Sequence, residues 1–327
     1  VLGFSGVVGG LPRIWAAYRR LLAEARTFRP HAAVLVDSPG FNFRLGPALR
    51  RLGIPVFYYI APQVWAWHAE RAAAMARWVD RLAVILPFEE DLYRKAGIPA
   101  TYVGHPLAHA LPEPNRKHAR ELLGLQEDGE YVVLMPGSRP GELKALAHLF
   151  IEAAKCLAAK RPKTHFLIPL VNRETRQAFE QSLYAANAQE LPIRILYGHA
   201  HDALQAADAA LIASGTATLE ALLLECPHVI TYKVPWLTWQ IMRRQALQSW
   251  IGLPNILAGE SIVPEIIQDQ ATADTLAQAL VQLLSDPDVR DRQIESFRQQ
   301  RARLKRNTPA LIAQALHPFL TGKPHAV

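Results

Sequence analysis

Short apolar runs alternate along most of the chain with longer segments in which apolar residues recur at helical spacing. The short runs predict strands, and the recurrence every three or four positions predicts amphipathic helices. The expected strands are 33–36, 56–59, 82–85, 101–103, 132–135, 165–169, 193–196, 209–213 and 229–232. The expected helices include 11–28, 44–52, 89–96, 142–160, 174–188 and 216–225, and the chain from about Thr272 onward is expected to be helical.

The order of these elements indicates an α/β protein. Strands that alternate with helices are typical of βαβ units around a parallel sheet, and continuously apolar strands fit a sheet covered on both faces. At roughly 100–200 residues per domain, 327 residues suggest two domains. Residues 104–118 are rich in turn formers and are expected to be a linker. We therefore predict an N-terminal domain over 1–110, a C-terminal domain over 111–290 and a helical segment over 291–327.

Composition and charge narrow the range of partners. Half of the residues are hydrophobic and 20% are charged, which favours a large core and argues against disorder. The formal charge of +7 fits either an ordinary basic surface or attraction to anions such as nucleotide diphosphates and an anionic membrane face. The sequence contains no basic run with interleaved aromatic residues, so nucleic acid is not an expected partner.

The cysteines and the apolar stretches indicate the compartment. Cys156 and Cys226 do not have the spacing of a disulfide framework or a metal site, so we expect free thiols in a reducing compartment. No secretory signal is visible, and polar residues interrupt the longest apolar stretch, 206–230. The sequence therefore predicts a cytoplasmic protein that can rest on a membrane surface.

Two glycine-containing turns follow predicted strands of the second domain. In the first, Gly137, Ser138 and Arg139 precede a long helix; Ser138 is placed to cap that helix, and the arginine can clamp a diphosphate. In the second, Ser214, Gly215 and Thr216 open another helix, and Glu220 lies one turn further along, where a carboxylate can bind ribose hydroxyls. Each could be an ordinary βα turn with a surface residue. Two of them in one sheet favour a ligand, because ligands bind at the carboxyl ends of parallel strands.

The first domain has a candidate base and an aromatic loop. Asp37 directly follows a predicted strand and could serve as a general base or as a plain turn residue. Trp65 and Trp67 lie in a loop after the next strand, where they are either core residues or an apolar wall for a sugar or acyl chain. Trp236, Trp239 and Trp250 belong to a second aromatic stretch that could face a membrane.

The histidines have no metal-ligand pattern. His199 and His201 are interpreted as loop residues, as are His105 and His109, because no carboxylate lies at a ligand spacing beside either pair. The sequence contains no Gly-x-Ser-x-Gly nucleophile turn. We therefore expect neither a metal site nor a serine nucleophile.

Taken in order, these motifs resemble the lipid-A-disaccharide synthases. The most specific are Pro-Gln-Val-Trp-Ala-Trp at 62–67 and Ser-Gly-Thr-Ala at 214–217. The resemblance covers almost the whole chain and is carried by 37–42, 59–67, 85–89, 103–106, 134–139, 168–172, 213–217, Glu220 and 253–255.

The resemblance implies a GT-B fold, in which two Rossmann-like domains with parallel sheets face a cleft. It implies an inverting transferase that joins UDP-2,3-diacylglucosamine to 2,3-diacylglucosamine 1-phosphate in a β-1,6 linkage, releases UDP and needs no metal or other cofactor. It also implies a peripheral position on the inner face of the inner membrane, against the phospholipid surface. A homodimer with exchanged C-terminal segments would be typical of the family.

The resemblance also assigns residues. Gly137, Ser138, Arg139, Ser214, Gly215, Thr216, Glu220 and Asn255 would bind the UDP-sugar. Asp37 matches the family's essential aspartate and would act as the base, and Asn42, Trp65 and Trp67 would form the acceptor and acyl wall. Many members have a second acid where this chain has Gly40, but the first acid is kept.

The start of the sequence departs from the family pattern. Members open with a strand and a Gly-Glu-x-Ser-Gly-Asp turn, whereas this sequence begins at Val1 and passes directly into a predicted helix. We therefore expect the N-terminal sheet to lack strands, and a chain truncated in this way could be inactive. The alternatives are a GT-B transferase for lipid-linked muramyl pentapeptide, a sugar-nucleotide 2-epimerase of the same fold and a non-catalytic UDP-binding scaffold.

Overall fold

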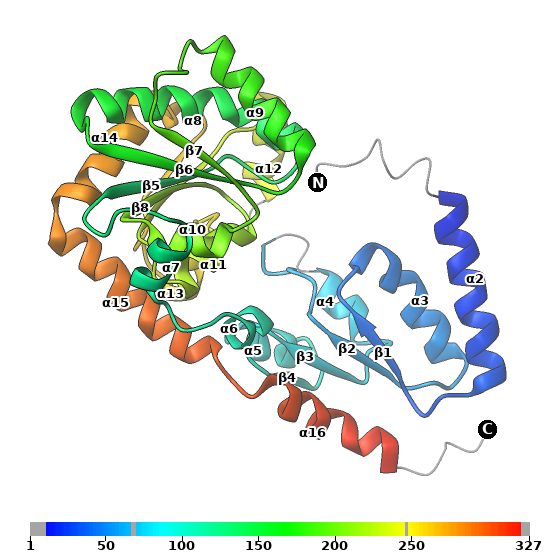
Figure 1. Ribbon diagram of the computed structural model, residues 1–327. Coiled ribbons are helices and arrows are strands. Elements are labelled where there is room, and N and C mark those ends of the chain that lie inside the picture. The colour runs from blue at the N-terminus through cyan, green and yellow to red at the C-terminus, as the bar shows by residue number, and fades with distance from the viewer. Residues whose placement is uncertain (1–10, 67–69, 246–247, 322–327) are drawn as a thin grey trace. The chain divides into compact units, whose positions relative to one another are not determined.

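The computed structural model of the chain describes residues 11–66, 70–245 and 248–321 (Figure 1). It divides into two compact units, the first made of residues 1–106 with 304–327 and the second of residues 107–303. Each unit is built on its own entirely parallel sheet. This arrangement confirms the α/β fold class expected from the alternation of apolar runs and helical segments.

The sheet of the first unit has four strands in their sequence order, β1-β2-β3-β4. Right-handed crossovers between consecutive parallel strands place all the connecting helices on one face of such a sheet. That face carries a core cluster in which Val56 and Tyr58 pack with Leu49 and Met75. The elements are β1 (Ala33–Val36), α3 (Pro39–Arg51), β2 (Val56–Tyr59), α4 (Glu70–Met75), β3 (Arg81–Val84), α5 (Glu89–Lys95) and β4 (Ala100–Tyr102), preceded by α2 (Leu11–Phe28).

The opposite face of this sheet is covered by a helix from the far end of the chain. Phe57 and Ala83 point away from the connecting helices and pack with Ala315 of α16 (Thr308–Thr321). The Thr308 hydroxyl fastens the start of α16 by donating to the carbonyl of Val103 at 2.9 Å. The first unit therefore closes its core only with residues that follow the entire second unit in sequence.

The sheet of the second unit has six strands in the order β10-β9-β8-β5-β6-β7. Because β6 and β7 lie on one side of β5 and β8 to β10 on the other, the strand order reverses between β5 and β8. The strands are β5 (Glu130–Met135), β6 (Thr164–Leu170), β7 (Ile193–Tyr197), β8 (Ala209–Ala213), β9 (His228–Tyr232) and β10 (Glu265–Ile267).

Helices pack against this sheet through an apolar core that includes Phe150, Phe166, Leu211 and Leu280. Helix α15 runs from the second unit to Leu304, where the chain returns to the first. The helical elements are α6 (Pro106–Ala110), α7 (Arg116–Leu122), α8 (Pro140–Lys160), α9 (Arg173–Ala185), α10 (Ala200–Ala206), α11 (Thr216–Leu223), α12 (Trp236–Gln245), α13 (Leu253–Ala258), η1 (Gln268–Gln270), α14 (Ala273–Ser285) and α15 (Pro287–Leu304).

Two local predictions were wrong. Strand β10 was not predicted, because three residues beside a polar turn are too short to show a pattern. Helix α3 begins at Pro39 rather than Arg44, because the proline, read as a turn signal, occupies the first helical turn, where its missing N–H has no cost.

Candidate functional site

The carboxyl end of β1 in the first unit is conformationally strained. Asp37 and Ser38 have φ angles of 43° and 48°, and Ile60, at the end of the neighbouring strand β2, has a φ of 64°. Left-handed backbone costs an L-residue roughly 1–2 kcal/mol, and it is most unusual for a β-branched side chain. Strain of this kind gathers at functional sites, where the surrounding structure must hold it in place.

Two side chains hold the Asp37 turn through its backbone. The Tyr58 hydroxyl and the Asn42 amide both donate to the Asp37 carbonyl, each at 2.6 Å. Burial raises the pKa of Tyr58 to about 12, so its hydroxyl keeps its proton at neutral pH and remains a donor. Because the backbone is fixed in this way, the exposed Asp37 carboxylate has a defined position. Asn42, expected in the acceptor wall, is buried beneath the turn instead.

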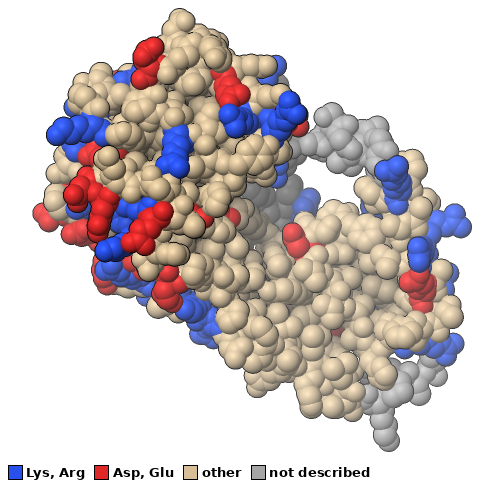
Figure 2. All heavy atoms as spheres, viewed as in Figure 1, with Lys and Arg blue, Asp and Glu red and all other residues tan. Residues whose placement is uncertain are grey.

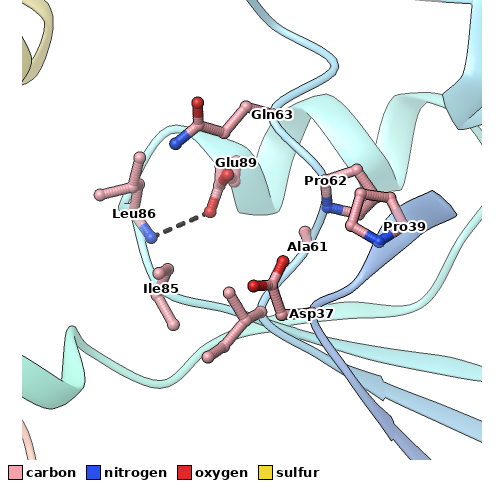
Figure 3. A pocket seen from close by; sticks show the side chains of 9 residues that line it. Asp37, Pro39, Ala61, Pro62, Gln63, Ile85, Leu86 and Glu89 are labelled. Atoms are coloured by element: carbon pink, nitrogen blue, oxygen red, sulfur yellow. Dashed lines mark hydrogen bonds between the residues drawn. The ribbon is translucent and has the colours of Figure 1, made fainter. Parts of the chain in front are cut away.

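A cavity of about 350 Å³ opens beside Asp37. The ends of β1, β2 and β3 form its sides, as expected for a site at the carboxyl edge of a parallel sheet. Figure 3 shows the carboxylates of Asp37 and Glu89 pointing into the same space from different elements. The lining residues are Asp37, Pro39, Ile60, Ala61, Pro62, Gln63, Ile85, Leu86 and Glu89.

Glu89 was not predicted as a site residue. Its side chain is only 1% exposed, and burial raises its pKa to about 7 despite hydrogen bonds from Trp65 and from the backbone of Leu86. A signal was present in the sequence, since Glu89 ends one of the family-like stretches and closely follows a predicted apolar strand. A buried carboxylate with a raised pKa in a cavity is typical of functional sites.

The predicted aromatic wall is described only in part. Trp65 is 5% exposed, packs edge-on against Phe88 with ring centroids 5.2 Å apart, and donates its indole N–H to Glu89 at 2.9 Å. Trp67 lies outside the described residues. Trp65 therefore buttresses the loop that lines the cavity.

The two glycine-containing turns of the second unit lie at the carboxyl ends of neighbouring strands. Strand β5 leads into the first turn, strand β8 leads into the second, and Met135 pairs with Ile212 between them. The strand order reverses between these two strands, and open α/β sheets bind ligands at this kind of switch point. The structure thus brings together residues that are far apart in the sequence.

The first turn needs its glycine. Gly137 has a φ of 125°, and a Cβ there would lie 2.7 Å from the Cβ of Glu142. Arg139 is exposed and pairs with Glu142 at 3.1 Å. The prediction that Ser138 caps α8 was wrong, because Arg139 occupies the cap position and Pro140 begins the helix. Ser138 therefore lies one residue before the cap position and does not cap the helix.

The second turn has open space at its glycine. Gly215 is extended, with a φ of 160°, and a Cβ there would meet nothing within 4 Å. The Ser214 hydroxyl donates to the Ile251 carbonyl at 3.1 Å, and Thr216 is the exposed first residue of α11. The fold itself does not require glycine here, so the open space is available to a ligand.

The histidine beside this turn is not a loop residue. His201 lies in α10, and its Nε2 is 3.6 Å from the Glu220 carboxylate. The neighbouring Glu220 carboxylate raises the pKa of His201. The loop interpretation of His201 was therefore wrong. Its carboxylate partner, Glu220, follows it by 19 positions on the adjacent helix α11, so the local spacing of residues could not indicate the contact.

Asn255 is fully buried and is bonded through both of its amide atoms. Its Nδ2 donates to the Val263 carbonyl and to Glu265, and its Oδ1 accepts from the backbone of Ile262 and Val263, at 2.8–2.9 Å. Glu265 in turn accepts from the backbone N–H of Ile251, whose carbonyl receives the Ser214 hydroxyl. Asn255 therefore belongs to a network that supports the second turn from below.

Within residues 11–66, 70–245 and 248–321, no group of three or more His, Cys, Asp or Glu side chains is arranged to hold a metal ion. Among the same residues, no helix is both long enough and apolar enough to cross a membrane.

The chain is similar to known proteins both in sequence and in structure. A family model described as lipid-A-disaccharide synthetase matches residues 1–316. The chain is 46% identical to the lipid-A-disaccharide synthase of Aromatoleum aromaticum, covering 99% of this chain and 84% of that protein. It is 42% identical to the synthase of Methylobacillus flagellatus, covering 98% and 85%.

Solved structures share the architecture at much lower identity. UDP-GlcNAc 2-epimerase from Neisseria meningitidis, bound to UDP-GlcNAc, has a TM-score of 0.61 at 14% identity over 92% of this chain and 80% of that one. Acinetobacter baumannii MurG has a TM-score of 0.57 at 17% identity, over 93% and 78%. These likenesses confirm the GT-B fold.

Proposed function

This chain belongs to the lipid-A-disaccharide synthase family, whose members are glycosyltransferases of lipid A biosynthesis, and on that premise we propose its substrates and the roles of its residues. The donor is UDP-2,3-diacylglucosamine and the acceptor is 2,3-diacylglucosamine 1-phosphate. The acceptor 6-hydroxyl displaces UDP at the anomeric carbon with inversion, which gives the β-1,6 disaccharide 1-phosphate.

The observation that carries this proposal is the chemical difference between the two sheet edges. In the second unit, both turns at the switch point present glycines and helix N-termini, joined by hydroxyls in one turn and by Arg139 in the other. Backbone N–H groups and a guanidinium suit a diphosphate, and they stabilise the negative charge that develops on departing UDP. In the first unit, a cavity receives the Asp37 carboxylate, which suits a hydroxyl that must lose a proton.

Each residue then has a role in a balanced displacement. The Asp37 carboxylate takes the proton of the acceptor 6-hydroxyl while that oxygen bonds to the anomeric carbon and the bond to the UDP oxygen breaks. Arg139 leaves its exposed pair with Glu142 to bind the diphosphate, which costs little because exposed ion pairs are weak. Glu220 accepts hydrogen bonds from the ribose. Asn42 and Asn255 act indirectly, by holding the Asp37 turn and the Ser214 turn.

The membrane surface is a proposed partner because the substrates carry acyl chains. Helix α2 exposes Trp15 and Phe28 beside several arginines, and α12 exposes Trp236. Aromatic side chains with nearby cations are typical of helices that lie in a membrane interface. We place the protein on the cytoplasmic face of the inner membrane. Vesicles of phosphatidylethanolamine and phosphatidylglycerol should cosediment with the chain but not with a Trp15→Ser/Phe28→Ser variant; no cosedimentation of either would contradict this.

A homodimer with exchanged C-terminal segments is a further proposal. The apolar face of α16 packs on β2 and β3 of its own unit, and the same contacts could form on the sheet of a second copy. Light scattering should then give twice the chain mass of 36.4 kDa. A monomer at all concentrations would contradict exchange.

The test of the function is product formation from defined substrates. Purified protein is incubated with UDP-2,3-diacylglucosamine and 2,3-diacylglucosamine 1-phosphate, and UDP and disaccharide are quantified. We expect both products in equal amounts, and neither when the acceptor lacks its 6-hydroxyl. UDP-N-acetylglucosamine alone serves as the comparison substrate, because its conversion to the 2-epimer would indicate an epimerase. A folded sample that binds UDP but makes no disaccharide would overturn the proposal.

A further inference from the structure

Glu89 faces the same cavity as Asp37 but has no role in the displacement described above. It is the first residue of α5, and its side chain is buried at 1% exposure. Figure 3 shows its carboxylate directed into the space between the ends of β2 and β3, with Asp37 on another side of that space. The site therefore contains a second carboxylate whose function is unassigned.

The carboxylate of Glu89 joins separate segments of the cavity wall. One oxygen accepts from the Trp65 indole at 2.9 Å, and the other accepts from the Leu86 backbone N–H at 3.0 Å. On the same helix, the Tyr93 hydroxyl donates to the Pro62 carbonyl at 2.6 Å. Residues 60–63 all line the cavity, so α5 fastens this wall at two points.

This arrangement lowers the stability of the fold. The groups that lower the pKa of Glu89 are neutral N–H donors, namely the Trp65 indole and the backbone of Leu86 and Ile85, and burial outweighs them. A buried charge that only neutral donors compensate is costly. A hydrophobic core does not need a buried ionisable side chain, so a carboxylate of this kind is expected to serve a functional site.

We propose that Glu89 is a positioning residue of the acceptor pocket: its ionised carboxylate holds the 60–65 loop in place and so fixes the acceptor sugar relative to Asp37. This inference rests on the proposed function, because it assumes that the cavity takes the acceptor. Both carboxylate oxygens must be acceptors for the loop and the 85–86 turn to be held together. A neutral amide has a single acceptor oxygen and would release one of the two donors.

The proposal predicts a pH dependence of acceptor use. The titratable groups around Glu89 are Asp37 across the cavity, Tyr93 from its own helix and Tyr102 from β4. Burial raises the pKa of both tyrosines, so they stay neutral across the range that matters. Below about pH 7 Glu89 takes up a proton, one oxygen becomes a donor that faces an N–H, and the loop loosens.

The stability effect has the opposite direction. The pKa of Glu89 is raised from 4.5 to about 7 in the folded protein, so the folded state binds more protons than the unfolded state between these values. The stability that Glu89 contributes is therefore complete below pH 4.5 and is lost as the pH rises through 7. A Glu89→Gln variant should gain in melting temperature relative to the wild type over this range.

The experiment compares Glu89→Gln with Glu90→Gln, a neighbour whose partner is Arg94 at the surface. For Glu89→Gln we expect the kcat/KM for the acceptor to fall roughly 10–100-fold, as misplacement by about 1 Å can cause. The Kd for UDP should stay within about twofold, and the melting temperature of the variant relative to the wild type should be higher at pH 8.5 than at pH 4.5. Amide exchange over residues 60–66 should be faster, and Glu90→Gln should match the wild type in every measurement.

A Trp65→Phe variant, which lacks the indole N–H, tests the connection. If Glu89 acts through Trp65, the two substitutions together should cost less than the product of their separate effects, because they remove the same contact. Unchanged acceptor kcat/KM and unchanged exchange in Glu89→Gln would overturn the proposal. So would a melting difference between the variant and the wild type that is the same at pH 4.5 and pH 8.5, since the buried carboxylate would then not be ionised in the range that the proposal requires. If even the wild type makes no disaccharide, the proposed function fails, while the exchange of 60–66 still decides whether Glu89 holds the loop.

Discussion

The two units use the same architecture for opposite chemistry. At the sheet edge of the first unit, the cavity is lined by Asp37 and Glu89, and none of the described residues that line it is Lys or Arg. At the sheet edge of the second, the turns present glycines, hydroxyls and Arg139. Parallel strands deliver turn residues to one edge in both, so the chemistry is decided by a few residues after each strand.

The surfaces differ in the same direction. Figure 2 shows Lys, Arg, Asp and Glu intermixed over the visible face of the second unit, whereas the visible face of the first is largely uncharged away from α2. Helix α16 contains no charged residue at all. A largely uncharged surface suits the acylated acceptor that we propose for the first unit.

The largest effect is expected at Asp37. Asp37→Asn keeps the side-chain shape and tolerates the left-handed backbone, but it cannot take a proton. We expect disaccharide formation to fall about 10²- to 10⁴-fold, as for loss of a general base, with an unchanged Kd for UDP. Asp91→Asn, on the exposed face of α5, is the matched control. Turnover that is unaffected in Asp37→Asn would remove Asp37 from the mechanism.

Substitution of Arg139 should give the next largest effect, and this effect should be on UDP binding. Charge-assisted hydrogen bonds contribute about 1.5–3 kcal/mol, so Arg139→Ala should raise the Kd for UDP roughly 10–100-fold in calorimetry. Arg139→Lys should be intermediate, because lysine cannot bind in bidentate fashion. Arg176→Ala, which also breaks an exposed pair, with Glu180, is the control. A Kd within twofold of the wild type would refute the diphosphate assignment.

Glycine-to-alanine substitutions should have smaller effects, and these should distinguish a glycine that a ligand requires from one that the fold requires. Gly215→Ala places a Cβ in open space, so melting should shift little, while UDP affinity falls roughly tenfold, about 1.4 kcal/mol. Gly137→Ala should lower both, since its Cβ would collide with Glu142. Gly40→Ala also meets open space and should change neither. Tight UDP binding by Gly215→Ala would mean that no ligand approaches that turn.

The smallest effect is expected at His201, which pairs with Glu220 within the second unit. Glu220 raises the pKa of His201, so the pair stabilises the fold below the ordinary imidazole pKa and loses this contribution as the pH rises through the raised value. His201→Gln should therefore lower the free energy of unfolding more at pH 5.5 than at pH 8.5. The loss should be no more than about 1 kcal/mol, because the pair is largely exposed. Exposed His118→Gln is the control. An equal loss at both pH values would contradict the assignment.

The apolar runs predicted the architecture well, because strands that are covered on both faces, such as Val56–Tyr59 and Ala209–Ala213, are apolar along most of their length. The strands Ala33–Val36, Val56–Tyr59 and Ala209–Ala213 have the predicted bounds. The side chains whose partners are distant could not be predicted in this way. Glu89 meets Trp65 from 24 positions away, and Asn42 lies buried beneath a turn that the sequence presents as a loop. The resemblance identified the motif stretches, but only the fold shows which residues of a stretch hold the turn from within and which are exposed to a ligand.

The return of α16 to the first unit has a consequence for how the protein is made. The bond between Thr308 and Val103 joins positions 205 residues apart, so the sheet that emerges first from the ribosome waits for its second cover. At about 5–20 residues per second, that wait is roughly 10 to 40 s. During it, Phe57 and Ala83 lack the helix that later buries them. Synthesis thus completes the second unit before the first, and the nascent chain presents an apolar sheet face of the kind that chaperones recognise.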